Sequence, residues 1–594
     1  MNNASIASVL ACLSALLLGA ATAAEKPLKI YILVGQSNME GHGAISTLDY
    51  MGEDPTTVPM LKEIKTPGGE LRECEKVWIS YNGTRKGNLK AGYGATPAKI
   101  GPELTFGIVM QKHVDEPILI IKNAWGGKSL HTDFRSPSAG RYELSKETTE
   151  QWAKRPDGAH GIPKEADRPK WWADKDAATG HYYRLMMTQT KEVLKDIQSV
   201  YPGYDPKQGY ELAGFVWFQG WNDMCAGETY YNGGQNPDAY KLYTQLMAHF
   251  IRDVRLELKA PAMPFVIGTI GVGGDKATGG IANLRKAMAA TADIPAFQGN
   301  VVAVDTGQFW DFRMAALAGL KGKVDQRLRP GYMIGEDGRI EPRESNVPGW
   351  ESIGLPVAQQ VWRYASVEPN ATKDVRARKE KRRFRQITLP EALKEWHKPE
   401  FDDGTWQSGK GPVGKGVWKH RDFPLVRSNS TWGDGEFLLM RTTFDAKNLD
   451  YAKFRISIMA AQGFEVYLNG HKIHTYVWWR DNPEYRAIEL GNEHVKHLKT
   501  GTNLLAVYAG CEYNRKTEEA FGAVDVMIEG ITTKNLAYVN STANKLRLMD
   551  KVCSREEGKI ILGCSNAGYH YLGSAKMLGQ IGKAFADALA RRSP

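Results

Sequence analysis

The chain has 594 residues, of which 42% are hydrophobic, so it is long enough for about two to four folded domains. This composition excludes a disordered or fibrous protein. The net charge is +10, and part of the excess lies in the basic run 376–385. Such a run is more typical of a solvated linker than of a surface that binds nucleic acid or an acidic polysaccharide.

The first residues have the composition of a targeting segment. Ile6 to Ala24 is apolar, rich in Ala and Leu, and ends in small residues, as expected of a secretory signal peptide with its cleavage site. A membrane anchor is the alternative, and it needs about 20 apolar residues with charged flanks. We expect a secreted or periplasmic protein with no membrane span after signal removal, which also argues against nucleic acid as a partner.

Five cysteines follow the predicted signal peptide, at positions 74, 225, 511, 553 and 564. Their spacing matches neither a zinc site nor a disulfide framework. Buried free thiols are the favoured interpretation, and a bridge between Cys553 and Cys564 is the alternative. We expect no metal and no cofactor.

Short apolar runs recur through the first part of the chain, over residues 29–34, 117–121, 211–218, 264–268 and 300–305. Such runs indicate strands of a parallel sheet that are buried on both faces. Helical patterns are expected near 182–200, 237–258 and 573–592, whereas 47–96 and 133–179 are expected to be surface loops. The alternation predicts a three-layer α/β/α domain with a parallel sheet.

The composition changes after Pro369. Short alternating runs between 384 and 531, with a hairpin signal at Asn469-Gly470, predict an all-β sandwich. Because a helical pattern returns near the C-terminus, we expect the sandwich to be inserted into the α/β domain. The expected boundaries are 1–24 for the signal peptide, 25–370 for the first part of the α/β domain, 371–385 for the basic linker, 386–533 for the sandwich and 534–594 for the second part of the α/β domain.

Polar residues with chemical potential follow three of the predicted strands. They are Ser37 in Gly35-Gln-Ser-Asn-Met39, the pair Gly126-Gly127, and Gln219-Gly-Trp-Asn-Asp223; His570 precedes the last predicted helix. Open α/β folds bind ligands at the carboxyl ends of their parallel strands. An acyl-transfer site needs a nucleophile, a base and donors for an oxyanion, and together these stretches supply all three.

In these motifs the chain resembles the SGNH hydrolases, and more closely their carbohydrate-esterase branch with sialate O-acetylesterases and acetyl-xylan esterases. The resemblance covers about 25–370 and 540–594. The predicted sandwich resembles galactose-binding-like jelly rolls, on the basis of Phe401-Asp-Asp-Gly-Thr-Trp406 and Val466-Tyr-Leu-Asn-Gly470.

The resemblance implies that Ser37 is the nucleophile and His570 the general base and acid. The N–H of Ser37, an N–H of Gly126 or Gly127, and the side chain of Asn222 would form the oxyanion hole. Gln36 and Gln219 are candidates for supporting this hole or for orienting the substrate.

The sequence departs from the family pattern at Ala567, where an Asp three residues before the His is usual. One interpretation is a Ser–His dyad assisted by a backbone carbonyl. The other is an acid supplied from elsewhere, either Asp305 or Asp223, since Asn566 cannot carry the charge.

Several further side chains are candidates for substrate contacts. Trp125 and Trp221 could stack on sugar rings, whereas Trp217 is expected in the core. His42 and His131 lie near the motif loops, although a structural role is the commoner one for such histidines.

The resemblance thus implies a serine esterase that removes O-acetyl groups from a carbohydrate. A noncatalytic glycan-binding protein on a degenerate esterase scaffold is a competing hypothesis, motivated by Ala567 and the large sandwich. An esterase for another acyl group is a third. The sequence predicts no particular sugar, and the oligomeric state stays open.

Overall fold

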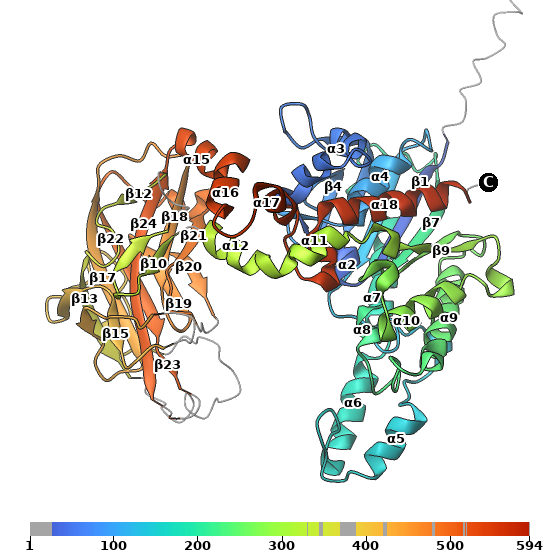
Figure 1. Ribbon diagram of the computed structural model, residues 1–594, viewed down its shortest axis with the longest axis horizontal. Coiled ribbons are helices and arrows are strands. Elements are labelled where there is room, and N and C mark those ends of the chain that lie inside the picture. The colour runs from blue at the N-terminus through green and yellow to red at the C-terminus, as the bar shows by residue number, and fades with distance from the viewer. Residues whose placement is uncertain are drawn as a thin grey trace, which may run out of the picture. The chain divides into compact units, whose positions relative to one another are not determined.

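The computed structural model describes residues 26–329, 331–343, 349–368, 388–419, 424–477, 482–514, 517 and 519–592. The predicted signal peptide and the basic linker lie outside these residues. The chain divides into two compact units, one made of the chain up to Lys321 together with the segment from Lys559, the other of Gly322–Gly558 (Figure 1).

The first unit is built on a seven-stranded sheet with the order β4-β3-β6-β1-β7-β8-β9. All neighbours are parallel except β3 and β4. The strands are β1 (Leu28–Gly35), β3 (Glu73–Tyr81), β4 (Arg85–Lys90), β6 (Ile118–Ala124), β7 (Tyr210–Phe218), β8 (Phe265–Thr269) and β9 (Val301–Asp305). The five predicted strands are therefore confirmed.

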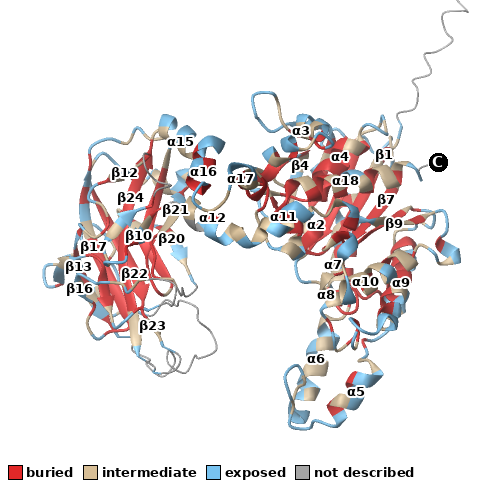
Figure 2. Ribbon diagram, viewed as in Figure 1, coloured by how far each residue is buried: buried red, intermediate tan, exposed pale blue. Residues whose placement is uncertain are grey.

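Helices cover both faces of this sheet, which gives three layers (Figures 1 and 2). Successive side chains of β1 alternate between two cores, with Tyr31 and Leu33 in one and Ile30 and Ile32 in the other. This alternation follows from the period of two residues in a strand. The first core includes α4 (Pro102–Met110) and α18 (Ala575–Ala590), and the second includes α7 (His181–Lys195), α9 (Lys241–Glu257) and α10 (Gly279–Ala290).

Two segments that were expected to be loops contain regular structure. Residues 47–96 contain α3 (Val58–Ile64) together with β3 and β4, which extend the central sheet. The expectation failed because β3 begins with exposed charged residues, and only its second half is buried. Residues 133–179 contain α5 (Lys146–Ala153) and α6 (Arg168–Ala178).

The second unit contains two large, mainly antiparallel sheets with a hydrophobic core, as predicted for a β-sandwich. One sheet has the order β14-β13-β17-β22-β19-β20; the path of the other is β16-β15-β24-β18-β21, with β12 and β23 also paired to β24. The strands of the first sheet are β13 (Val361–Val367), β14 (Gln407–Lys410), β17 (Phe437–Ala446), β19 (Phe464–Leu468), β20 (His471–Tyr476) and β22 (Gly501–Gly510). Those of the second are β12 (Trp350–Ile353), β15 (Val413–Lys415), β16 (Ser430–Thr431), β18 (Lys453–Met459), β21 (Arg486–Leu490), β23 (Glu512–Tyr513) and β24 (Ala520–Ile531).

The expected bounds of the sandwich, 386–533, differ from those of the second unit. β12 and β13 precede residue 370, yet they pair with β24 and β17 of the sandwich. The unit extends from Gly322 to Gly558. The change in composition after Pro369 therefore does not coincide with the start of the fold, because backbone pairing and not composition defines a sheet.

All five cysteines after the predicted signal are free thiols, including Cys553 and Cys564. Within the described ranges, no helix has both the length and the hydropathy required to cross a bilayer.

Candidate active site

The turn after β1 presents Ser37 at the carboxyl edge of the sheet. Ser37 opens the short helix α2 (Ser37–Glu40), and its side chain is buried, with 8% of the residue exposed. The turn ends at Gly41, whose φ is 89° and where a Cβ would lie 2.2 Å from the Cα of Gly101, so only glycine fits. Neither the Ser37 hydroxyl nor its N–H forms a hydrogen bond with another described residue, and both remain available to a ligand.

The loop that carries His570 lies against this turn. The Asn38 side chain donates from Nδ2 to the carbonyl of Tyr569, at 3.1 Å, across 531 positions of sequence. These two residues are the chain neighbours of Ser37 and His570. The nucleophile candidate and the base candidate thus belong to segments in direct contact.

The histidine loop, η12 (Gly568–Gly573), has an unusual backbone that is firmly held. Tyr571 and Leu572 have φ values of 51° and 55°, a region that side chains other than glycine rarely adopt. The buried Tyr571 hydroxyl accepts from the N–H of Gly271 at 2.7 Å and lies 2.6 Å from Oγ1 of Thr306. These contacts compensate for the strain and fix the position of His570.

The tautomer of His570 follows from its neighbour Asn566. The Ala567 N–H donates to Oδ1 of Asn566 at 2.7 Å, which identifies this atom as the carbonyl oxygen. The same oxygen lies 3.1 Å from Nδ1 of His570, so Nδ1 carries the proton. Nε2 is then the unprotonated nitrogen that a general base requires.

Positive charge and burial keep His570 neutral. Burial is the main cause that lowers its pKa from 6.5 to about 4, and His42 and Lys99 lower it further. The His42 ring stacks on that of His570, with centroids 4.0 Å apart and planes inclined by 2°. Lys99 Nζ lies 3.1 Å from Nδ1 of His42. His42 thus lies beside the base candidate.

A chain of amides determines the orientation of Asn222. The Gln36 Oε1 atom accepts from the backbone N–H groups of Gly220 and Asn222, at 3.2 and 3.3 Å, and from Gln219 Nε2 at 3.1 Å. Its Nε2 therefore donates to Oδ1 of Asn222, at 3.0 Å. Asn222 Nδ2 is left without a hydrogen bond to any described residue, as an oxyanion donor must be.

Gly126 and Gly127 form the loop after β6, and neither N–H has a hydrogen-bond partner among the described residues. A Cβ at Gly126 would lie 2.9 Å from Oε2 of Glu40, so a side chain here would displace the Glu40 carboxylate at the end of α2. Gly127 has a φ of 72° and no atom within 4 Å of a built Cβ. Both glycines offer free donors beside α2.

The buried side chains of Gln219 and Asp223 hold the loops of the site together through hydrogen bonds. The Gln219 amide nitrogen also reaches the carbonyl of Lys128 at 3.0 Å and Oδ2 of Asp223 at 2.5 Å, so its donors are fully used. Asp223 is fully buried and accepts from the N–H groups of Leu130 and His131, at 2.8 and 3.0 Å. Burial raises its pKa to about 6.

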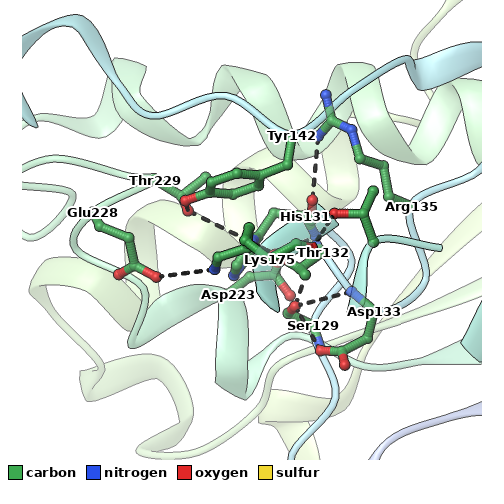
Figure 3. Close-up of polar contacts among 11 residues, drawn as sticks. Ser129, His131, Thr132, Asp133, Arg135, Tyr142, Lys175, Asp223, Glu228 and Thr229 are labelled. Carbon is green, nitrogen blue, oxygen red and sulfur yellow. Dashed lines mark hydrogen bonds and ion pairs between the residues drawn. The ribbon is translucent and has the colours of Figure 1, made fainter. Parts of the chain in front are cut away.

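His131 belongs to a buried polar network around Asp223 (Figure 3). Its Nδ1 lies 2.7 Å from Oγ1 of Thr132, and burial lowers its pKa to about 3. Beside it, Lys175 lies 3.7 Å from Glu228 and over the ring of Tyr142. His131 is thus a structural residue, and the expectation of a substrate contact is not supported.

Neither candidate for a relocated acid contacts His570. Asp305 is exposed and caps its own turn, because its Oδ1 accepts from the N–H of Gly307 at 2.8 Å. The carboxylate of Asp223 already accepts hydrogen bonds from Leu130, His131 and Gln219. The structure instead gives His570 the neutral amide of Asn566, a residue that the sequence alone excluded as an acid because it carries no charge. Asn566, like Lys99, was missed as a partner because its contact depends on the local fold of the histidine loop.

The three tryptophans differ in their surroundings. Trp217 is fully buried and donates from Nε1 to the hydroxyl of Tyr243 at 3.0 Å, as expected for a core residue. Trp125 packs against Phe134 and Tyr182. Trp221 lies next to Tyr569, with ring centroids 5.7 Å apart. No cluster of three or more metal-ligand side chains occurs within the part of the chain that the structure describes.

Ser37, Gly126-Gly127, Asn222 and His570 follow one another around the carboxyl edge of a mainly parallel sheet covered by helices, which is the arrangement expected of an SGNH hydrolase. Residues 27–155 and 165–309 match the family model described as "Carbohydrate esterase, sialic acid-specific acetylesterase". The matched residues all lie in the α/β unit, which is therefore similar to that family.

Solved structures provide further similarities. A protein from Arabidopsis thaliana is 18% identical, with 48% of this chain and 87% of that chain covered and a TM-score of 0.28. A carbohydrate acetylesterase from Xanthomonas citri is 13% identical, with 57% and 67% covered and a TM-score of 0.25. NanS is 14% identical, with 48% and 79% covered and a TM-score of 0.26. A comparison with curated proteins gave no match.

Proposed function

We propose that this protein is a carbohydrate O-acetylesterase that hydrolyses acetyl esters of a glycan through an acyl-enzyme on Ser37. The observation that carries the proposal is the 3.1 Å hydrogen bond between Asn38 Nδ2 and the Tyr569 carbonyl. It joins the turn that bears the hydroxyl to the loop that bears the imidazole. The family match supports an ester of a carbohydrate as the substrate.

In acylation, Ser37 Oγ attacks the acetyl carbonyl while His570 Nε2 takes the hydroxyl proton. The tetrahedral intermediate then collapses, and the bond between the carbonyl carbon and the sugar oxygen breaks. His570 returns the proton to that oxygen, so the sugar leaves as a neutral alcohol.

The negative oxygen of the intermediate needs preorganised donors. Asn222 Nδ2, the Ser37 N–H and an N–H of Gly126 or Gly127 have no competing partner among the described residues. Losing one donor of this kind typically costs about 10² to 10³ in kcat.

In deacylation, water attacks the acetyl group as His570 takes its proton. The bond to Ser37 Oγ breaks as His570 returns this proton to the serine, and acetic acid leaves and ionises to acetate in solution. Asn566 keeps Nδ1 protonated throughout, so a carboxylate is not required to select the tautomer. Papain-like proteases, with Cys-His-Asn, use an amide at the same place.

We also propose that the protein is exported, since residues 6–24 have the composition of a signal peptide. The sandwich would then bind glycan or brace the catalytic unit outside the cytoplasm.

The test is acetate release from acetylated sialic acids, acetyl-xylan and acetylated pectin by the full chain. A Ser37→Ala variant should lose about 10⁴-fold or more in kcat. Ser199→Ala, which alters an exposed serine of η4 (Ile197–Ser199), is the matched control. Glycan binding without any acetate release from the wild type would favour the noncatalytic hypothesis, and a preference for long acyl esters would favour another acyl substrate.

A further inference from the structure

Two aromatic side chains from distant segments meet beside the candidate catalytic groups. Trp221 immediately precedes Asn222, and Tyr569 immediately precedes His570. Their ring centroids are 5.7 Å apart and their planes are inclined by 36°. One ring is therefore attached to the segment of the oxyanion donor and the other to the segment of the base.

Tyr569 differs sharply from Tyr571 in the same loop. Tyr571 is fully buried, and its hydroxyl is held by Gly271 and Thr306. Tyr569 is 45% exposed, and its hydroxyl forms no hydrogen bond within the described residues. Its carbonyl nevertheless accepts from Asn38, so a fixed backbone presents an exposed ring. Nearly half of this residue is therefore open to solvent and available to a ligand.

Trp221 is also distinct from the other tryptophans near the site. It is half-buried, with one side packed on both cores of the α/β unit, and its Nε1 has no hydrogen-bond partner among the described residues. Trp217, by contrast, is enclosed and has its indole N–H satisfied. Trp221 and Tyr569 thus combine flat apolar faces with free polar groups at one edge of the site.

The proton that His570 returns to the leaving oxygen indicates which part of the substrate lies near these two rings. The general acid must reach the leaving oxygen, so the leaving alcohol passes beside His570. The Tyr569 ring contacts His570, with centroids 4.4 Å apart and planes inclined by 67°. A group attached to the leaving oxygen can therefore lie against Tyr569 and its neighbour Trp221, while the carbonyl oxygen of the acyl group faces the oxyanion donors.

We propose that Trp221 and Tyr569 form a subsite that binds the pyranose ring of the leaving alcohol. The apolar C–H face of a sugar packs on aromatic rings, and the indole N–H and phenol O–H can bond to its hydroxyl groups. This inference rests on the proposed function, because it assumes that the leaving alcohol is a sugar. It assigns to the two rings the recognition of that sugar, and not of the acyl group.

The experiment compares two acetyl esters that differ in the alcohol, both followed by released acetate. One is the best acetylated glycan among the sialic acid, xylan and pectin substrates, and the other is ethyl acetate. Tyr569→Ala and Trp221→Ala should each lower the ratio of kcat/KM for the glycan to that for ethyl acetate by about tenfold, mainly through KM. A tenfold change corresponds to about 1.4 kcal/mol.

Tyr210→Ala is the matched control, because Tyr210 is 42% exposed at the start of β7, at the opposite end of that strand from Gln219. It should leave the ratio unchanged. If the wild type is active but the Tyr569→Ala ratio stays within twofold of the wild type, the subsite is wrong while the esterase proposal stands. If the wild type releases acetate from no glycan, the carbohydrate esterase proposal itself fails. Tyr569→Ala keeps the test decisive even if Trp221→Ala fails to fold.

Discussion

Asn566 Oδ1 lies 3.1 Å from Nδ1 of His570, in the place where a hydrolase triad usually has a carboxylate. The Ala567 N–H holds this oxygen toward the imidazole at 2.7 Å. The Asn566 amide therefore orients the imidazole as a triad carboxylate would, but it carries no negative charge. Four predictions separate these effects and test the rest of the site.

The first prediction concerns Asn566. Asn566→Ala should lower kcat by at least about tenfold, because Nε2 is no longer held as the unprotonated nitrogen. Asn566→Asp should keep activity near neutral pH and move the acidic limb of kcat/KM to higher pH, since a carboxylate raises the pKa of His570. Full activity in Asn566→Ala would show that the amide has no role in catalysis.

The second prediction concerns pH. The base must be unprotonated, and burial together with His42 and Lys99 lowers the pKa of His570 to about 4. Activity should therefore persist as the pH falls through 6.5 and decline only near pH 4. Lys99→Met removes a positive charge, so the pKa of His570 should rise and the acidic limb of kcat/KM should move upward.

Lys62→Met, in an exposed position of α3, is the control for this profile. An acidic limb near pH 6.5 in the wild type would contradict the lowered pKa.

The third prediction concerns Gln36. A glutamate there can still accept from the N–H groups of Gly220 and Asn222, but it has no hydrogen to donate to Asn222 Oδ1. The Asn222 amide should then turn over, so that its oxygen faces the site. Gln36→Glu should lower kcat by about 10², measured per folded molecule. Because Gln36 is buried, the added charge should also lower the melting temperature.

A double-mutant cycle sharpens this test. If Gln36 acts through Asn222, Gln36→Glu should cause little further loss in an Asn222→Ala background. Additive losses of kcat in the double variant would mean that Gln36 acts independently of that amide.

The fourth prediction concerns stability. Lys122 and Glu103 are fully buried, and Lys122 Nζ lies 2.7 Å from Oε2 of Glu103 and 2.9 Å from the carbonyl of Glu40 at the end of α2. Lys122→Met leaves a buried carboxylate unpaired and should lower the free energy of unfolding by about 3–5 kcal/mol. Urea unfolding measures this change.

Two variants provide the comparison for Lys122. Lys122→Met combined with Glu103→Gln should recover part of the loss, because the unpaired charge is gone. Lys170→Met breaks the exposed pair with Asp174 and should cost less than about 1 kcal/mol. Equal losses in the buried and exposed variants would refute the argument.

Part of the fold and part of the candidate site could be predicted from the sequence alone. The apolar runs that became β1, β6, β7, β8 and β9 were recognisable because a strand buried on both faces must be continuously apolar. The polar residues that follow β1, β6 and β7 were then expected at one edge, since parallel strands all end on the same side. This is why Ser37, Gly126, Gly127 and Asn222 could be named together.

Tertiary structure decided what each of these side chains can do. β3 joins the sheet although its first half is charged and exposed, since pairing with β6 needs only the backbone. The roles of Asn566, Gln36 and Asp223 depend on which donors face which acceptors, and these partners come from separate turns and loops. Local sequence determines which polar group is present, but long-range packing determines its hydrogen-bond partner. Packing therefore decides whether the group is already hydrogen-bonded or remains available to a ligand.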